Sequence, residues 1–575
     1  MKPFRYLSVF MALLPLSFIG KGQISLDEFY QTLARKGEVN FYFVEKDPAK
    51  AAALSRVVSL DSRKDSLYSA YANQEEFQKF LALGYQPLRI GNAAPKNGTE
   101  MASTIEEMQY WNRYPTYGVY LEMMRNFAET YPHICRLDTI GKSVQDRLIL
   151  CLKISDNVNE EEPEPGFFYS ACINGDELTG FVLMLRLIDH LLSNYGTDEE
   201  ATRLVNGMQI YINPISNPDG AYIKSDTNVS ESIRYNANNI DLNRNYPDFW
   251  KGTPGTIQPE NQAMIDYAQQ HDWVMSINIH DGSQVLNFPW DGFTSNRRKH
   301  ADYNWWVDIS KRFVDTCRKV DHTVYHDVNE EGYIDGGDWY VVNWSRQDYM
   351  NAFRHVREQT LEISVNKTPP ASQLPTFWNI NHRALINYMK EAGYGIQGKV
   401  SDSVSGKPVR ALVTVRNHDK DSSQVYSSLH HGMFFRPISA GSYDLVFSAP
   451  GYHDKVVKSV AAADFSVTDC NVTLVPLVVD TLPQDTVANR LYERASDYRI
   501  SPNPVRDLLV VQADFPFTVD AVYNAAGRQM PLPAETRRAF SNRFSLSVSA
   551  YPQGLYMLQV RTRNGEIRRL KFIRQ

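Results

Sequence analysis

Residues 234–245 have the sequence Arg-Tyr-Asn-Ala-Asn-Asn-Ile-Asp-Leu-Asn-Arg-Asn, and this stretch carries the strongest local signal in the chain. Asn243 and Arg244 stand side by side, and Arg234 lies nine residues before Asn243. Arginine can grip a carboxylate through two parallel hydrogen bonds. A lone Asn-Arg pair is typical of a solvated surface, but a second arginine nearby favours a site that binds an anion.

Strands that alternate with longer helices surround this stretch, from about residue 105 to 392. This alternation predicts an α/β fold in which a mixed sheet is covered by helices, and functional groups in such sheets gather just beyond the strand ends. Asn174 directly follows one predicted strand, His280 closes a second and Glu362 lies within a third. The predicted strands are 166–173, 208–214, 273–279 and 358–365, and the predicted helices are 178–193 and 298–320.

Several further motifs follow one another in a fixed order. They are Asn217-Pro218-Asp219-Gly220, the run Asp-Leu-Asn-Arg-Asn-Tyr-Pro from Asp241, Phe288-Pro289-Trp290-Asp291, Trp339-Tyr340-Val341-Val342, Gln347-Asp348-Tyr349 and Thr360-Leu361-Glu362. With these motifs, the segment from Tyr110 to about Tyr394 resembles the zinc carboxypeptidases of the M14 family. It is nearer to their regulatory branch (carboxypeptidases N, E, M and D) than to the pancreatic one, and the resemblance covers about half of the chain.

The resemblance implies a role for each of the residues that match. Glu362 matches the general base, which takes a proton from a metal-bound water. Arg234 matches the residue that stabilises the oxyanion. Asn243 and Arg244 match the clamp on the free C-terminal carboxylate of a substrate, and Tyr340 matches the tyrosine that caps its last residue.

A preference for basic residues is implied in the same way. Asp291 lies eleven residues after His280, at the base of the expected pocket for the terminal side chain, where an Asp pairs with Lys or Arg in this branch. Gln347 is also typical of the branch. A buried carboxylate favours a cationic partner. The alternative is that Asp291 only forms a turn after Pro289-Trp290.

The metal site departs from the family pattern at one position. The family motif is His, two residues, then Glu, whereas this chain has Asn174-Gly175-Asp176-Glu177. The resemblance implies one zinc ion, with Glu177 and His280 as ligands and Asn174 at the substituted position. A neutral amide oxygen binds zinc more weakly than an imidazole does.

Two hypotheses about function therefore stay open. The first is a secreted zinc metallocarboxypeptidase that removes C-terminal residues, Lys or Arg by preference, from peptides or proteins. The second is a catalytically impaired pseudopeptidase that binds C-terminal carboxylates without cutting. A substitute ligand such as His271, His326 or His355 has no positive sign in the sequence.

The rest of the chain predicts further domains on either side. The expected segments are a signal peptide at 1–22, an N-terminal α+β region at 23–104, the carboxypeptidase-like domain at 105–394, a β-sandwich at 395–476, a linker at 477–497 and a second all-β module at 498–575. The sandwich resembles the transthyretin-like regulatory domain of the same branch, through Gly398-Lys399-Val400 and Gly441-Ser442-Tyr443. The last module, with Ser501-Pro502-Asn503-Pro504 and a basic end, resembles a type IX secretion sorting domain.

Composition narrows the class of protein further. The net charge of −6 over 575 residues gives no nucleic-acid footprint. Lys2 and Arg5 precede an apolar run at 7–19 that is too short to span a bilayer, so a signal peptide is expected rather than a membrane anchor, and no later stretch predicts a transmembrane segment. Five scattered cysteines predict buried free thiols. Together with the sorting domain, these features predict passage through the periplasm and the type IX secretion machinery to the outer-membrane surface or the medium.

Overall fold

The computed structural model describes residues 25–91, 98–477, 498–524, 528–532, 541–562 and 567–575. The expected signal peptide and nearly all of the expected linker lie outside these residues. The chain forms two compact units, Met1–Val478 and Val479–Gln575, and each is described by itself.

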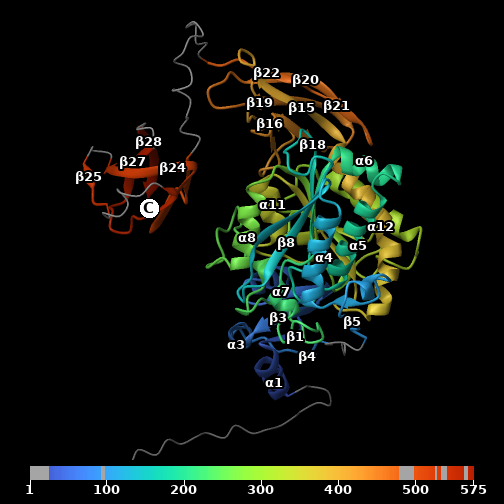
Figure 1. The fold of residues 1–575 in the computed structure, drawn as a ribbon. Helices are drawn as coiled ribbons and strands as arrows, with labels where there is room; N and C mark the ends of the chain where they lie inside the picture. Colours follow the sequence, from blue (N-terminus) through green and yellow to red (C-terminus); the bar gives the residue numbers. More distant parts are fainter. Residues whose placement is uncertain (1–24, 92–97, 478–497, 525–527, 533–540, 563–566) are drawn as a thin grey trace, which may run out of the picture. The chain divides into compact units, whose positions relative to one another are not determined.

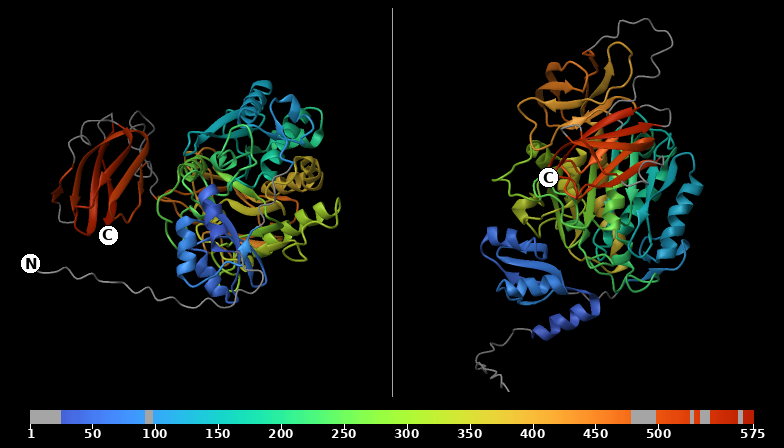
Figure 2. Two further views of the ribbon diagram at one scale, coloured as in Figure 1. Left: turned by 90° about the horizontal axis from the view of Figure 1, so that it is seen from below. Right: turned by 90° about the vertical axis from the view of Figure 1, so that its left-hand side faces the viewer.

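The first unit begins with a small four-stranded antiparallel sheet of order β2-β3-β1-β4 (Figure 1). Its buried face is aromatic, because Phe41 and Phe43 alternate with more exposed residues along β1 and meet Phe77 and Phe80 of a helix. Figure 2 shows this sheet and its helices in blue. The elements are α1 (Leu26–Lys36), β1 (Glu38–Val44), α2 (Pro48–Leu54), β2 (Ser59–Lys64), β3 (Leu67–Asn73), α3 (Gln74–Ala82) and β4 (Arg89–Ile90). We call residues 25–91 the N-terminal domain.

An eight-stranded mixed sheet forms the centre of the first unit, in the order β13-β12-β14-β11-β9-β10-β8-β7. Four neighbouring strands, β14, β11, β9 and β10, run parallel, so their carboxyl ends meet at one edge. The strands are β7 (Cys135–Lys142), β8 (Leu148–Ile154), β9 (Gly166–Ala171), β10 (Gln209–Asn213), β11 (Trp273–His280), β12 (Ser283–Phe288), β13 (Tyr333–Asp335) and β14 (Arg357–Ser364). The predicted α/β fold is confirmed.

Helices cover both faces of this sheet (Figure 1). Side chains alternate along β9, so that Phe167 and Tyr169 join the core on one face, while Phe168 joins the smaller core on the other. The larger core contains α4 (Tyr117–Thr130), α5 (Thr179–Asn194), α9 (Tyr303–Arg318) and α12 (Leu374–Lys390); the smaller contains α8 (Pro259–Ala268) and α11 (Arg346–Arg354). Shorter elements are β5 (Met101–Ala102), β6 (Tyr114–Pro115), α6 (Glu199–Gly207), α7 (Pro218–Ala221), α10 (Gly336–Trp339), and the 3-10 turns η1 (Glu106–Met108), η2 (Leu242–Arg244), η3 (Ala371–Gln373) and η4 (Glu391–Gly393).

Two small sheets follow and enclose a separate apolar core. One has the order β18-β15-β21, with β22 also paired to β15, and the other has the order β17-β16-β19-β20. Their bounds are β15 (Gly395–Asp402), β16 (Leu412–Val415), β17 (Val425–Tyr426), β18 (Met433–Arg436), β19 (Gly441–Ser448), β20 (Lys455–Ala462), β21 (Val467–Asp469) and β22 (Val472–Leu474). The expected all-β character of this segment is confirmed.

The second unit has its own six-stranded sheet and core. Two separate strands are expected at 508–511 and 519–523, but the structure has one long strand, β24 (Leu508–Asn524). The strand pairing shifts register between Gln512 and Phe517, and the strand continues through this irregularity. The other strands are β23 (Tyr498–Ser501), β25 (Gln529–Met530), β26 (Ser541–Ser547), β27 (Gly554–Thr562) and β28 (Ile567–Arg574).

All five cysteines are buried and none of them forms a disulfide, as predicted. In the part of the chain that the structure describes, the search for a helix with the length and apolar character to cross a membrane finds none.

Candidate active site

The carboxyl edge of the parallel strands brings the predicted residues together. Asn174 and Glu177 follow β9, while His280 ends β11 and lies opposite Glu362 of β14 in the strand register. The turn after β9 is packed tightly, because a Cβ atom on Gly175 would come within 2.3 Å of the backbone of Gly220. This contact fixes the turn that presents Asn174 and Glu177.

A hollow of about 400 Å³ opens beside these strand ends. Its lining includes seven predicted residues: Arg234, Asn243, Arg244, His280, Asp291, Tyr340 and Glu362. Asn174, Glu177 and Gln347 are fully buried beside this lining. The lining also includes Asp61 of the N-terminal domain, which the sequence analysis does not select.

The two residues of the predicted carboxylate clamp, Asn243 and Arg244, lie on the turn η2. The Asn243 amide oxygen accepts a hydrogen bond from the backbone N–H of Arg346 at 3.0 Å, so its orientation is fixed. Arg244 donates from Nη1 to the Asn243 carbonyl at 2.9 Å and from Nη2 to the carbonyl of Leu60. Among the described residues its Nε has no hydrogen-bond partner.

Asp291 lies in the wall of the hollow and is 6% exposed. Gln347 donates from Nε2 to its carboxylate at 2.7 Å, which places the two branch-typical residues in direct contact. Burial raises the pKa of Asp291 to about 6, although a hydrogen bond with Ser345 and the charge of Arg244 oppose the rise. Within the described part of the chain, no cation forms an ion pair with this carboxylate.

Glu177, a predicted metal ligand, is already neutralised by side chains of the protein. Its Oε1 atom accepts from Lys367 Nζ at 2.7 Å and from Arg234 Nη1 at 3.0 Å, and its Oε2 atom lies 2.7 Å from His280 Nδ1. Burial alone would raise the pKa of Glu177, but the charges of Lys367 and Arg234 and the contact with His280 hold it below its ordinary range. Both carboxylate oxygens are therefore engaged.

The other two ligand positions are also engaged. When the Asn174 amide is oriented with its oxygen toward Arg234, this oxygen accepts hydrogen bonds from the guanidinium nitrogens at 2.6 to 2.9 Å. His280 Nε2 faces the amide nitrogens of Asn278 at 2.8 Å and Asn243 at 3.4 Å, so this nitrogen accepts and Nδ1 carries the proton toward Glu177. One amide, one ion-paired carboxylate and one fully bonded imidazole do not fit a zinc ion as they stand.

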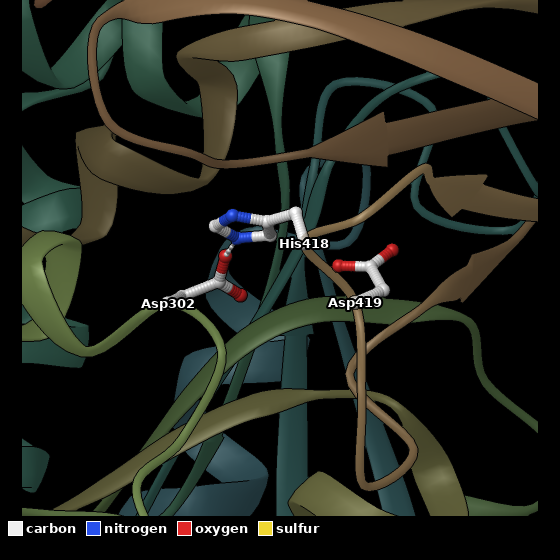
Figure 3. Close-up of side chains that lie close together, drawn as sticks. All are labelled: Asp302, His418 and Asp419. Carbon is white, nitrogen blue, oxygen red and sulfur yellow. Dashed lines mark hydrogen bonds and ion pairs between the residues drawn. The ribbon is translucent and has the colours of Figure 1, made fainter.

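Two groups of potential metal-ligating side chains occur elsewhere in the described residues, and neither includes Glu177 or His280. One is the acidic group Asp156, Glu162 and Glu164. The other is Asp302, His418 and Asp419, where Figure 3 shows the His418 imidazole directed at the Asp302 carboxylate.

The Asp302 group is a structural ion-pair network. Arg436 donates to both Asp302 oxygens at 2.9 and 3.0 Å, and Arg357 donates to Oδ2 at 2.9 Å. Two guanidinium groups already balance the carboxylates, so a metal cation would meet like charge. The network joins the central sheet to the β-sandwich, since Asp302 precedes α9 and Arg436 belongs to β18.

The N-terminal domain covers the clamp, which the sequence analysis does not foresee. Tyr340 donates to the carbonyl of Asp61 at 2.7 Å, and its ring packs against the aromatic core of that domain. Glu38 accepts from the backbone N–H groups of Arg234 at 3.0 Å and Tyr235 at 3.1 Å. Tyr71 donates to Asp176 at 2.9 Å, so the N-terminal domain also contacts the turn that carries Asn174 and Glu177.

Lys367 is a further site residue that the sequence analysis does not select. It lies five residues after Glu362, outside the matched motif, and its ammonium bonds both Glu177 and Asp61. One signal in the sequence could have identified Lys367: it is a basic residue that comes shortly after a strand ending at the site.

The candidate substitute ligands lie elsewhere. His271 packs among Tyr211, Tyr267 and Trp273, and His355 contacts the carbonyl of Ser422 at 2.9 Å. His326 lies 3.2 Å from Arg318. None of these three contacts involves Glu177 or His280.

Comparison with known proteins points to the same family as the sequence motifs and the fold. Residues 120–384 match the model of the zinc carboxypeptidase family, 395–475 match a carboxypeptidase regulatory-like domain, and 499–574 match a secretion system C-terminal sorting domain. Carboxypeptidase D of Homo sapiens is 34% identical over 374 residues, which is 62% of this chain and 26% of that protein. This chain thus spans about a quarter of that relative.

Two shorter relatives are covered over about four fifths of their length. Carboxypeptidase M of Mus musculus is 33% identical over 347 residues, or 58% of this chain and 78% of that protein. The carboxypeptidase N catalytic chain of Mus musculus is 31% identical over 380 residues, which is 59% of this chain and 81% of that protein. The fold and these relatives define the metallocarboxypeptidase class. The chain belongs to the zinc carboxypeptidase family and ends in a secretion sorting domain.

Proposed function

We propose that this chain recognises the C-terminal residue of peptides or proteins and prefers Lys or Arg. The observation that carries the proposal is one hollow lined by both Arg244 and Asp291. One end offers a guanidinium for a carboxylate, and the other offers an unpaired carboxylate for a cation. A free C-terminal Lys or Arg residue has both charges.

The chemistry at the carboxylate end is direct. The Arg244 guanidinium now bonds two backbone carbonyls, those of Asn243 and Leu60, and a carbonyl is a weaker partner for it than a carboxylate is. Exchanging the Leu60 carbonyl for the terminal carboxylate of a peptide would be favourable. The clamp is therefore formed but is held by the protein's own backbone.

The preference for a basic side chain rests on Asp291. Gln347 supplies one hydrogen bond to Asp291, and the carboxylate needs a cation before its charge is balanced. An apolar terminal residue would leave that charge buried and unpaired, so the site discriminates by penalty as well as by attraction.

Access to the clamp requires the N-terminal domain to move. Leu60 and Asp61 of strand β2 hold Arg244 and Tyr340 through their carbonyl groups. A peptide end must replace both contacts, so peptide and N-terminal domain compete for the same two side chains. The apparent affinity for peptide is reduced by the fraction of molecules in which the domain is docked.

In the arrangement described, the site binds the C-terminus of a peptide without cleaving the peptide. Asn174 is bonded to Arg234, and Glu177 is bonded to Lys367 and Arg234, so neither side chain is available to a metal ion as it stands. Zinc-dependent hydrolysis, the reaction of the family, is the second candidate function. The presence of Glu177, His280 and Glu362 together at the strand ends favours it.

We further propose that the protein acts on the outer-membrane surface or in the medium, reached through the periplasm and the type IX secretion machinery. The match of residues 499–574 to a secretion sorting domain supports this location. Peptide ends released outside the cell would be the accessible ligands.

A pair of assays tests the function. Isothermal titration of the mature chain with a peptide ending in Arg should give binding, whereas the same peptide with a C-terminal amide should not bind. Mass spectrometry of the peptide, with and without added zinc, then measures cleavage. No binding of either peptide would refute recognition, and zinc-dependent loss of the terminal Arg that disappears in Glu362→Gln would establish the second candidate.

A further inference from the structure

Four charged side chains form a closed cluster beside the predicted metal position. Lys367 Nζ lies 2.6 Å from Asp61 Oδ1 and 2.7 Å from Glu177 Oε1. Arg234 Nη1 lies 3.0 Å from each of the same two oxygen atoms. Two carboxylates and two cations thus alternate around a ring, and we call Asp61, Glu177, Arg234 and Lys367 the four-charge cluster.

The four-charge cluster is sealed by the N-terminal domain. Its side chains are between 2% and 16% exposed. The Tyr71 ring lies over both cations, with its centroid 5.3 Å from the Arg234 guanidinium carbon and 5.0 Å from Lys367 Nζ. Cations at this distance from an aromatic face are attracted to it. The domain therefore supplies one of the two carboxylates and the aromatic cover.

We infer that Lys367 has taken over the neutralisation of Glu177 from a metal ion, and that its second bond, to Asp61, makes the N-terminal domain an integral part of the site. The inference goes beyond peptide recognition and does not depend on it. It concerns which partner Glu177 has and what holds the domain in place.

Charge balance carries the inference. With Asp61 present, the two carboxylates of the cluster match the two cations. Arg234 also pairs through Nε with Asp241 at 2.9 Å, so Lys367 is the cation that depends on Asp61. Without Asp61, Lys367 would have Glu177 as its one carboxylate partner in the described structure and would share it with Arg234, at low exposure, where unbalanced charge is costly. A divalent cation at Glu177 would lie beside the positive charges of Lys367 and Arg234, which already pair with this carboxylate.

Docking of the domain and metal binding are consequently linked. A metal ion that draws Glu177 away from Lys367 would weaken docking of the N-terminal domain, and docking of the domain would weaken metal binding at Glu177 by the same factor. Asn174 belongs to this linkage, because it bonds the same guanidinium that bonds Asp61 and Glu177. A histidine at position 174 would have no acceptor oxygen for Arg234.

Hydrogen exchange of the full mature chain, read by mass spectrometry on the β1 and β3 peptides, tests the docking. Asp61→Asn and Lys367→Met should each speed exchange in these strands by about tenfold or more, because each removes two of the four ion pairs of the cluster. Asp65→Asn is the matched control, since Asp65 is an exposed carboxylate in the same hairpin, and it should leave exchange unchanged. Asp61→Asn keeps the size of the side chain, so its result stands even if Lys367→Met fails to fold.

Adding zinc tests the linkage. Asn174→His combined with Lys367→Met should bind about one zinc per chain and show faster exchange in the N-terminal domain, whereas zinc should not change exchange in the natural protein. Unchanged exchange in Asp61→Asn would overturn the inference. The inference would also be overturned if the natural protein bound one zinc ion per chain and hydrogen exchange in the N-terminal strands stayed as slow as without zinc.

Discussion

Replacing Asp291 by Asn should remove the preference for basic peptide ends. The carboxylate is 6% exposed and has Gln347 as a hydrogen-bond partner, so a bound Lys or Arg side chain would depend on it for charge balance. Removing one partner of a buried charge pair costs about 2 to 5 kcal/mol. That range corresponds to a loss of about 30-fold to about 5,000-fold in affinity for an Arg-ended peptide.

The assay compares two peptides that differ in the last residue, Arg or Leu, by fluorescence anisotropy on the intact chain. Displacing the N-terminal domain reduces the affinity for both peptides equally, so the ratio of the two dissociation constants isolates the contribution of Asp291. The natural protein should prefer the Arg peptide, and Asp291→Asn should lose that preference, because it weakens binding of the Arg peptide and removes the unpaired charge that disfavours the Leu peptide.

Asp335→Asn provides a matched control. Asp335 is 2% exposed and lies close to Asp291, but burial and neighbouring carboxylates raise its pKa to about 9, so it is uncharged at neutral pH. An amide in its place should leave the ratio unchanged. Equal binding of the two peptides by the natural protein, or a ratio in Asp291→Asn within about twofold of the natural one, would refute the reasoning.

Three further outcomes are expected. Affinity for the Arg-ended peptide should fall about tenfold from pH 7 to pH 5, because Asp291, with a pKa of about 6, is then protonated and cannot pair with a cation; titration of the Leu-ended peptide should show no such change. Arg244→Ala should weaken binding of every peptide with a free C-terminus, and a constant affinity in anisotropy titrations would contradict the clamp assignment. Asp302→Asn should lower the free energy of unfolding in urea by about 3 to 5 kcal/mol, since it leaves buried Arg357 without a carboxylate partner and Arg436 with Asp419 alone, whereas Asp315→Asn at an exposed pair should have little effect.

The central fold could be predicted because each of its signals is local. Apolar runs such as 166–173 fix buried strands, and parallel strands necessarily bring their carboxyl ends to one edge. That geometry alone places the residues after β9 beside His280 and Glu362. The motifs on the intervening loops then supply the clamp without any knowledge of packing.

The N-terminal contribution to the site could not be predicted in the same way. Strand β2 has the sequence Ser-Leu-Asp-Ser-Arg-Lys, in which Leu60 is the one apolar residue, so it shows no alternation that would mark a strand. Asp61 meets Lys367 across 306 positions of the chain, and that contact follows from how two domains dock. The effect of Asn174 was likewise hidden, because the sequence shows a missing ligand but not that Arg234 and Lys367 bind the groups left behind.

For some helices and strands the observed bounds differ from the predicted ones, and the difference has a physical reason. A helix is expected at 298–320, but α9 begins at Tyr303, because the residues before it serve the seam with the β-sandwich: Arg298 pairs with Asp421, and Asp302 with Arg436. Polar contacts with another domain outweigh helix propensity at this end.

The amount of zinc bound per chain tests the central claim most directly. The mature protein is incubated with excess zinc, freed of unbound metal by gel filtration, and analysed by plasma mass spectrometry. Because Lys367 and Arg234 hold Glu177 and Asn174, the natural chain should retain far less than one zinc ion per molecule. One tightly held zinc ion per natural chain would contradict the account.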